Sequence, residues 1–520
     1  MSAKWNPLRG LFRKPGPERQ LHGFATKKRL ARLQIPEKSD THPGAVYKKG
    51  EMIGTQYEVL GVLGVGGFSV VYLVYSHDNH QTYALKTLRD QFLRDEETRQ
   101  QFRLEAKLWI HLERHPHIVA ANFIDELGGR LYIGMEYIAP DEEGLNSLEG
   151  YISRRPPDLP QSLRWGVQIC HGMEYAHERG IRCHRDLKPA NIMITQDRVV
   201  KITDFGFADV IDASRARRRF EITAHRRRTA EQEQSGFGTP AYMPPEQFRN
   251  AARCDERSDI YSFGVVLYQM AGHGRLPFQE ATAAARRQTA GHMWREMHRL
   301  HTEAPIPPLA TPLFPVIQRC LQKEPSKRYQ TFRELRIDLD GLMLRVTGEK
   351  ITPQKTEELE AWELYNKAFS LASLGQLEEA IGYYEKVTQL EPNHTNAWNN
   401  KGVCYKKQGK VQEALKCYDM AIEADRHNAS AWNNKGNLLT SIGRHTEAVV
   451  QFNRAIEADP SNESAWLSKA MAEDRLGLLQ EAGQSYQRFV DLKPTQLASH
   501  LENARKRIAE LKKMPRQSGR

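Results

Sequence analysis

The hydrophobic and polar positions of this 520-residue chain follow two different patterns. Residues 57–75 alternate β-forming side chains around a glycine cluster, which predicts two strands joined by a flexible turn. Short apolar runs at 82–86 and 131–138 predict further buried strands, and residues 95–114 predict a helix. The first part of the chain is therefore expected to combine strands with helices.

From about residue 361 the pattern becomes helical and repeats every 34 residues, the period of the tetratricopeptide repeat. Large residues, glycines and alanines recur with this spacing, where two helices of a repeat must pack closely. The series are Trp398, Trp432 and Trp466 preceded by Leu364; Gly375, Gly409, Gly443 and Gly477; Ala380, Ala414, Ala448 and Ala482; Tyr384, Tyr418, Phe452 and Tyr486. We expect an all-α solenoid of four repeats over 361–496 and a capping helix over 497–514.

Charge is distributed unevenly along the chain. The formal net charge is +11, and residues 1–50 alone contain 12 Lys and Arg against 3 Asp and Glu. Five prolines in this segment preclude a long helix, and it has no apolar core of a secretory signal. We expect a disordered basic tail. Contact of this tail with an anionic membrane or with nucleic acid is the alternative that its charge leaves open.

The cysteines and the apolar runs concern the cellular setting. Six cysteines are scattered without a C-x-x-C pair, which is typical of a reduced, intracellular chain. No uninterrupted apolar run reaches about 18 residues, so we expect no membrane span. A cytoplasmic protein is the resulting expectation.

One short motif carries the chemistry. Residues 184–191 read HRDLKPAN, and the DFG sequence of residues 204–206 follows a short apolar stretch. Phosphoryl transfer passes through a loose, charge-spread transition state, so it needs positioned charges more than covalent chemistry. The motif supplies an aspartate to orient a hydroxyl, a lysine to meet the migrating phosphate, and oxygen ligands for a metal ion.

These motifs resemble those of the eukaryotic-type (Hanks-type) Ser/Thr protein kinases. The resemblance implies an α+β two-lobed protein kinase fold over 57–345, a linker over 346–360, and ATP and Mg²⁺ bound between the lobes. It implies catalytic roles for Asp186 and Lys188 and metal binding by Asn191 and Asp204. Lys188 also favours transfer to serine or threonine over tyrosine.

The same resemblance implies the nucleotide-binding positions. The glycine-rich turn would approach the ATP phosphates, with Ser69 standing where the family often has a third glycine. Lys86, in an apolar strand, would hold the phosphates and pair with Glu105, and the backbone of Glu136 and Ile138 would bond adenine. The complete set is Gly64, Val65, Gly66, Gly67, Phe68, Ser69, Val71, Ala84, Lys86, Glu105, Glu136 and Ile138.

Three more matches concern the second lobe. The GTPAY sequence of residues 238–242 resembles a platform for a peptide substrate, which disfavours a small-molecule kinase. Glu246 is expected to form a buried ion pair with Arg328, and Asp259 to anchor the backbone of the catalytic motif. We predict these three residues to be structural.

The segment between the DFG motif and Glu246 spans residues 204–246 and is long for the family. It holds two clusters of three arginines and four candidate phosphorylation sites, Ser214, Thr223, Thr229 and Ser235. We predict that phosphorylation of Thr229 or Ser235 orders this segment by pairing with Arg185. An unregulated insert is the open alternative.

In the repeats, Asn366, Asn400 and Asn434 recur every 34 residues on the first helix of each pair. An asparagine ladder can bond the backbone amides of an extended peptide, which predicts a peptide groove. The alternative is that these residues are only part of the repeat consensus.

Together these patterns predict a Ser/Thr protein kinase that transfers the ATP γ-phosphate to proteins, with repeats that recruit substrate or partner proteins. The competing interpretation is a tetratricopeptide scaffold whose kinase-like part senses nucleotide and has weak or no turnover. The intact Lys86, Asp186, Asn191 and Asp204 argue against that alternative.

Overall fold

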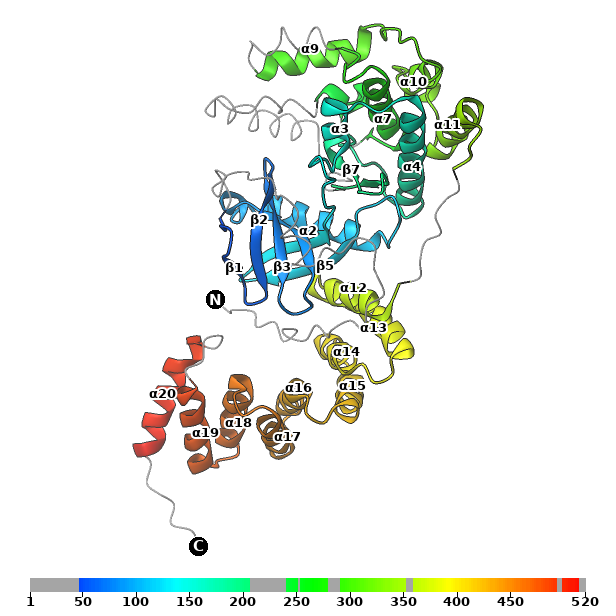
Figure 1. Ribbon diagram of the computed structural model, residues 1–520. Coiled ribbons are helices and arrows are strands. Elements are labelled where there is room, and N and C mark those ends of the chain that lie inside the picture. Colours follow the sequence, from blue (N-terminus) through cyan, green and yellow to red (C-terminus); the bar gives the residue numbers. More distant parts are fainter. Residues whose placement is uncertain are drawn as a thin grey trace. The chain divides into compact units, whose positions relative to one another are not determined.

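The computed structural model describes residues 46–205, 240–250, 253–278, 290–351, 359–492 and 498–513. Two compact units divide the chain, one containing the described residues up to 351 and the other those from 359 onward. Figure 1 shows strands and helices in the first unit and helices alone in the second. The predicted order, a two-lobed α+β fold followed by an all-α solenoid, is confirmed. Nearly all of the predicted basic tail lies outside the described residues.

The first unit begins with a six-stranded antiparallel sheet in the order β1-β2-β3-β4-β6-β5. Its strands are β1 (Met52–Ile53), β2 (Tyr57–Val65), β3 (Ser69–Ser76), β4 (Thr82–Leu88), β5 (Ala121–Leu127) and β6 (Arg130–Glu136), and helix α2 (Glu96–His111) packs against β5. Aromatic side chains fill the core of this sheet, with the rings of Tyr57 and Phe123 stacked at 5.6 Å. Gly134 is required there because a Cβ would overlap the Phe123 ring.

The rest of the first unit is mainly helical and carries one small hairpin. Its helices are α3 (Leu148–Arg154), α4 (Leu159–Glu178), α6 (Pro245–Arg249), α7 (Glu256–Ala271), α9 (Ala290–Glu303), α10 (Phe314–Cys320) and α11 (Phe332–Thr347); the hairpin is β7 (Ile192–Ile194) and β8 (Val200–Ile202). Helix α7 is central, because most of its side chains are buried and it packs against α4 and α10. Asp255 and Ser258 close a capping box that fixes where this helix begins.

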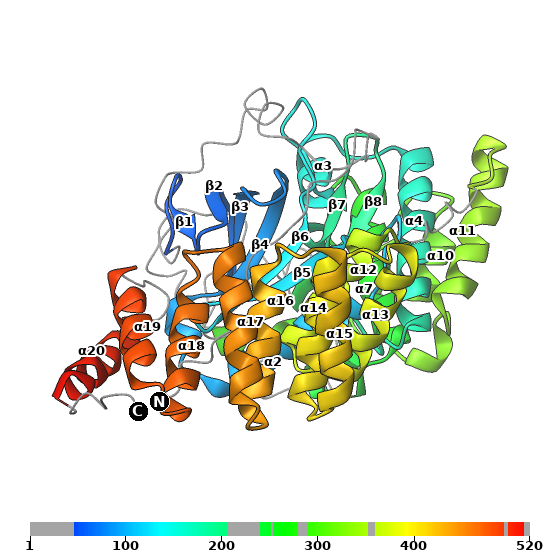
Figure 2. The same cartoon turned by 90° about the horizontal axis from the view of Figure 1, so that it is seen from below.

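The second unit is a row of helix pairs. These are α12 (Ala361–Ser373) with α13 (Leu377–Leu390), α14 (Thr395–Lys407) with α15 (Val411–Ala424), α16 (Ala429–Ser441) with α17 (His445–Ala458), and α18 (Glu463–Arg475) with α19 (Leu479–Asp491), followed by α20 (Ala498–Lys513). Figure 2 shows α14 to α17 side by side. Each pair turns through a glycine in the left-handed region, which explains the 34-residue glycine series.

Close packing within a pair explains the recurring aromatic residues. A Cβ at Gly436 would come 2.6 Å from the Phe452 ring, and one at Gly402 would come 2.7 Å from the Tyr418 ring. Phe452 and Tyr418 are fully buried. Large residues on the second helix of a repeat therefore pack directly against the backbone of the first.

All six cysteines are buried free thiols, in agreement with their scattered spacing. None of the helices in the described ranges combines the length and the apolar composition that a bilayer crossing requires.

Candidate active site

A buried lysine between two carboxylates lies at the centre of the candidate site. Lys86 comes from β4, in which every side chain is buried, and its Nζ lies 2.5 Å from Oε1 of Glu105 on α2. The same Nζ lies 2.7 Å from Oδ1 of Asp204, which follows β8. The side chains of Lys86 and Glu105 are only 8% and 9% exposed, whereas that of Asp204 is 31% exposed. One cation therefore joins the sheet, helix α2 and the hairpin.

Electrostatics keep this cluster charged. Burial alone would lower the pKa of the Lys86 ammonium, but the attraction of Asp204 and then of Glu105 outweighs it and raises that pKa. Burial would likewise raise the pKa of the Asp204 carboxyl, but Lys86 and, more weakly, Lys188 lower it to about 2. Asp204 is therefore an anion at physiological pH, the form in which a carboxylate can bind a metal ion.

A second cluster forms from residues 186–191. Lys188 Nζ lies 2.7 Å from Oδ2 of Asp186, and Asn191 donates from Nδ2 to that same Oδ2 at 3.1 Å and to the Asp186 carbonyl at 2.9 Å. Burial lowers the pKa of Lys188, but Asp186 outweighs burial and the pKa is raised. Thr203 donates its backbone N–H to the Asn191 carbonyl at 3.0 Å, so the residue before Asp204 is bonded to this cluster.

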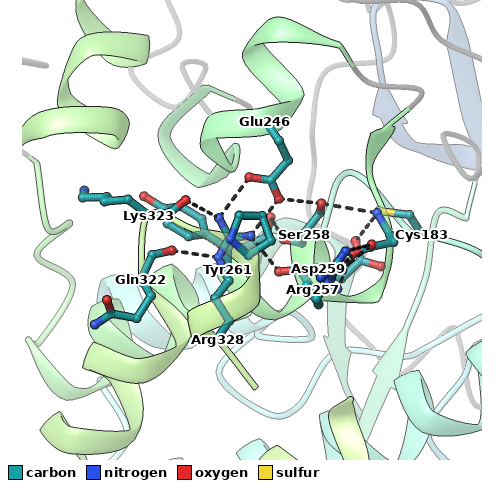
Figure 3. A network of polar contacts seen from close by, with 12 residues as sticks. Cys183, Glu246, Arg257, Ser258, Asp259, Tyr261, Gln322, Lys323 and Arg328 are labelled. Atoms are coloured by element: carbon teal, nitrogen blue, oxygen red, sulfur yellow. Dashed lines mark hydrogen bonds and ion pairs between the residues drawn. The ribbon is translucent and has the colours of Figure 1, made fainter. Parts of the chain in front are cut away.

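Asp259 on helix α7 holds the backbone of this loop. Its two carboxylate oxygens accept from the backbone N–H of His184 at 2.6 Å and of Arg185 at 2.9 Å. The thiol of Cys183 donates to the same carboxylate at 3.2 Å, and Figure 3 shows Cys183 beside Asp259. The predicted anchoring role of Asp259 is confirmed.

The backbone is strained at two residues of the site. Arg185 has φ of 64° and Asp204 has φ of 65°, values that side chains other than glycine rarely adopt. Such conformations persist only where surrounding contacts fix them, and here Asp259 bonds the Arg185 N–H and Lys86 bonds the Asp204 carboxylate.

The predicted ion pair between Glu246 and Arg328 is also confirmed. The guanidinium donates two bonds to the carboxylate, at 2.7 Å and 2.9 Å, and Arg328 is 1% exposed. Its remaining N–H groups bond the carbonyls of Gln322, Arg257 and Lys323, as Figure 3 shows. Because all donors are used, this buried charge fixes helix α6 against α7.

Comparison with known proteins decides the family. A family model described as the protein kinase domain matches residues 57–336, more than half of the chain. The chain belongs to the protein kinase family. Models of the tetratricopeptide repeat match residues 361–394, 395–428 and 429–462, which are the first three helix pairs of the second unit.

Several bacterial kinases are similar to this chain. Serine/threonine-protein kinase PrkC of Bacillus subtilis is 30% identical over 355 residues, covering 66% of this chain and 49% of that protein. Serine/threonine-protein kinase PknB of Mycobacterium tuberculosis is 33% identical over 297 residues, covering 55% of this chain and 43% of that protein. PknB of Mycobacterium leprae is 34% identical over the same length. The chain thus spans less than half the length of these curated relatives.

The glycine-rich turn of the kinase domain lies between β2 and β3. Gly66 donates its N–H to the Ser69 carbonyl at 2.8 Å, and Gly64 lies opposite Val71 in the antiparallel pairing of β2 with β3. Phe68 packs against Phe92 with ring centroids 4.7 Å apart. The residues predicted to approach phosphate therefore form one tight turn. Val65, Gly67 and Ser69 belong to the same turn and its strand ends.

The predicted hinge follows β6. Glu136 ends β6 and lies opposite Tyr83 of β4, next to the pair of Ala84 with Met135. The Ile138 carbonyl accepts from Asn146 Nδ2 at 2.9 Å. Ala84, Glu136 and Ile138 are thus near one another along two adjacent strands and their continuation. Their contact with adenine stays a prediction.

The regulatory predictions fall mainly on residues that the structure does not describe. Thr229 and Ser235 lie outside the described residues, together with Ser214, Thr223 and the first two residues of the GTPAY sequence, Gly238 and Thr239. Arg185 is described and is 5% exposed, and its carbonyl accepts from Gln247 Nε2 at 3.0 Å.

The asparagine ladder of the repeats lies mostly inside the solenoid. Asn366, Asn400 and Asn434 are 3–4% exposed. Asn400 donates to the Tyr365 hydroxyl at 2.9 Å, and Asn434 donates to Oδ1 of Asn399 at 3.0 Å, each in the preceding repeat. Because these amide donors bond neighbouring repeats, the contacts favour the interpretation of repeat-consensus residues over that of a peptide groove.

Two residues near the site had no role in the sequence interpretation. Gln247 donates to the Arg185 carbonyl, and none of the sequence motifs described above includes this glutamine. Lys201 on β8 makes an ion pair with Glu136. Its signal was available, because a lysine between Val200 and Ile202 in a short apolar strand requires a partner, by the reasoning that identified Lys86.

The segment between α2 and β5 contains two histidines whose protonation opposes folding. Burial lowers the pKa of His117 to about 4, although the bond to the Val200 carbonyl partly opposes this shift. Burial, and then the neighbouring His117, lowers the pKa of His115 to about 3. His117 Nδ1 donates to the Val200 carbonyl at 3.2 Å. An unfolded histidine has a pKa of about 6.5, so below that pH the unfolded chain binds protons that the folded chain excludes. Stability is therefore lost as pH falls from about 6.5 toward 4.

We predict that His117→Asn reduces this pH dependence while keeping a donor for the Val200 carbonyl. The stability difference between pH 7.5 and pH 5 should shrink by about 1 kcal/mol, after allowance for partial solvent screening. Thermal or urea unfolding of the full chain at both pH values measures it, with the exposed His80→Asn as control. If the stability difference between pH 7.5 and pH 5 is the same in His117→Asn as in wild type, protonation of His117 does not destabilise the fold.

Proposed function

We propose that the chain is a Ser/Thr protein kinase that transfers the γ-phosphate of ATP to protein hydroxyl groups. The observation that carries the proposal is that Lys86, Glu105 and Asp204 share one charge cluster, bonded through Thr203 to the cluster of Asp186, Lys188 and Asn191. Its bacterial relatives are named serine/threonine-protein kinases. Positioned charge of this kind is what phosphoryl transfer requires.

ATP is the proposed phosphate donor. Its phosphates would lie between the glycine-rich turn and the Lys86 ammonium, which Glu105 holds in place. The backbone of Glu136 and Ile138 would bond the adenine, as the family resemblance implies.

Mg²⁺ is the proposed metal, and the donor atoms fit it. Asn191 uses its amide nitrogen on Asp186, which leaves the side-chain oxygen as the atom it can offer to a cation. Asp204 is anionic and keeps 31% of its side chain exposed. Oxygen ligands of this type suit a hard cation, and Mg²⁺ would neutralise charge on the phosphates.

Asp186 would act on the substrate hydroxyl. It would accept the proton as the new O–P bond forms and the bond between the γ-phosphorus and the bridging oxygen of ADP breaks. Lys188, 2.7 Å from the Asp186 carboxylate, would meet the γ-phosphate as it migrates. The lysine thereby stabilises charge on the group that moves.

The second unit is proposed to recruit protein substrates or partners. Tetratricopeptide arrays present extended surfaces, and tethering a partner raises its local concentration at the kinase domain. We place the reaction in the cytoplasm, a proposal supported by six free, buried thiols.

Asp186→Asn should sharply reduce the proposed transfer, while its amide oxygen can still accept from Lys188 and Asn191. Loss of the group that accepts the proton should reduce phosphate transfer by roughly 10²- to 10⁴-fold. The assay measures transfer from γ-labelled ATP to the chain itself and to a generic protein substrate. Asp197→Asn, an exposed aspartate in the turn between β7 and β8, is the matched control. Equal transfer by Asp186→Asn and wild type would refute the proposal; ATP binding without any transfer in wild type would favour the nucleotide-sensing scaffold.

We also propose that phosphorylation of Thr229 or Ser235 activates the enzyme through Arg185. Mass spectrometry of protein incubated with ATP should find phosphate on one of these residues. The corresponding Thr229→Ala or Ser235→Ala variant should lose roughly tenfold or more in activity, because the phosphate no longer pairs with the Arg185 guanidinium. Full activity in both variants would support the unregulated alternative.

A further inference from the structure

A second ion pair crosses from the six-stranded sheet to the hairpin of the kinase domain. Lys201 belongs to β8, where its neighbours Val200 and Ile202 are fully buried. Its Nζ lies 3.0 Å from Oε2 of Glu136, the last residue of β6. The two side chains are 15% and 12% exposed. Because most of both side chains is shielded from solvent, this pair depends on its own geometry more than an exposed pair does.

Residues 117–120 form the connection beside this pair. The backbone N–H and carbonyl of Ile202 bond His117 at 2.9 Å and Val119 at 2.8 Å, so these residues run along β8. The Glu136 N–H donates to the Ala120 carbonyl at 2.9 Å, and Ala120 donates to the Glu136 carboxylate at 3.4 Å. One short segment is therefore bonded to the hairpin on one side and to the predicted hinge on the other.

Helix α2 is bonded to the same segment. The Trp109 indole donates to the Val119 carbonyl at 2.9 Å, and its ring also lies 5.8 Å from the Lys86 ammonium. The ion pair of Lys201 with Glu136 thus belongs to a frame that includes the helix carrying Glu105. Lys201 precedes Asp204 by three residues in the sequence. Glu136 is the residue whose backbone is proposed to bond adenine.

The energetics indicate a role in positioning. Replacing a buried ion pair as a whole often costs little stability, whereas removing one partner leaves an unpaired buried charge. An interaction with small net stability that joins two elements of a site fixes their geometry more than it holds the fold together.

We infer that the ion pair of Lys201 with Glu136 sets the distance between the adenine-binding hinge and the metal-binding Asp204. The inference rests on the proposed kinase function and adds a pair of positioning residues to it. ATP spans these two points, so a pair that fixes them together pre-organises the site for the whole nucleotide. Adenosine, which reaches only the hinge, depends on the pair less.

The experiment compares Lys201→Gln, Glu136→Gln and the double variant in the full chain. Each single variant should weaken Mg·ATP binding by roughly three- to tenfold, while adenosine binding changes by less than about twofold. In transfer assays the KM for ATP should rise with kcat nearly unchanged, because ground-state and transition-state binding are lost together. The double variant should be weakened by less than the product of the two single effects.

Two controls separate positioning from general damage. The Lys327–Glu324 pair has the same chemistry but is 61% and 63% exposed, so Lys327→Gln and Glu324→Gln should leave ATP affinity unchanged. Exchanging the charges, Lys201→Glu with Glu136→Lys, should restore the affinity for Mg·ATP toward that of wild type. This exchanged variant replaces a single variant in the test if the single variant folds poorly.

Calorimetry of nucleotide binding keeps this test separate from catalysis. Unchanged ATP affinity in both single variants, equal losses for ATP and adenosine, or multiplicative effects in the double variant would overturn the inference. If wild type binds ATP but transfers no phosphate, the proposed function fails while the affinity comparison still decides the role of the pair.

Discussion

The rest of the site depends on one ammonium group held between two carboxylates. Lys86 is buried in β4, and such a charge is stable only when partners compensate its lost hydration. Glu105 supplies one partner from helix α2, and Asp204 supplies the other from the end of the hairpin. The cost of leaving this charge unpaired therefore draws three separate elements to one point. Because Asp204 is the more exposed partner, it is also the one that can face a metal and phosphates.

The second lobe contributes rigidity by a different means. Asp259 on helix α7 is 1% exposed, and its carboxylate accepts from the backbone N–H groups of His184 and Arg185. These bonds hold the strained conformation of the catalytic loop. Arg328 similarly uses its guanidinium on Glu246 and neighbouring carbonyls. These buried charges touch no proposed substrate. Asp259 fixes the backbone of the two residues before Asp186, and Arg328 fixes helix α6 against α7. Positioning by buried polar networks is thus common to both parts of the site.

Sequence predicted the fold class, the repeats and the central cluster because each leaves a periodic or compositional signal. The 34-residue series followed from glycines that must turn left-handed and aromatics that pack on helix backbones. Lys86 was recognisable as a charge in an apolar strand. The direction of the asparagine ladder could not be predicted, because a 34-residue period gives no information on which face of a helix meets its neighbour. In the structure, Asn400 and Asn434 bond the preceding repeat. Gln247 and the pairing of Lys201 with Glu136 depend on contacts between distant segments, which no local pattern encodes.

The most direct test of the central cluster is the affinity of Lys86→Met for Mg·ATP and for adenosine, measured by calorimetry on the full chain. If the ammonium of Lys86 meets the phosphates, ATP binding should weaken by roughly tenfold or more, a change of about 1.4 kcal/mol or greater. Adenosine binding should stay within about twofold of wild type, because it carries no phosphate. Equal affinity of wild type and Lys86→Met for ATP would contradict the account, since the cluster would then not face the nucleotide.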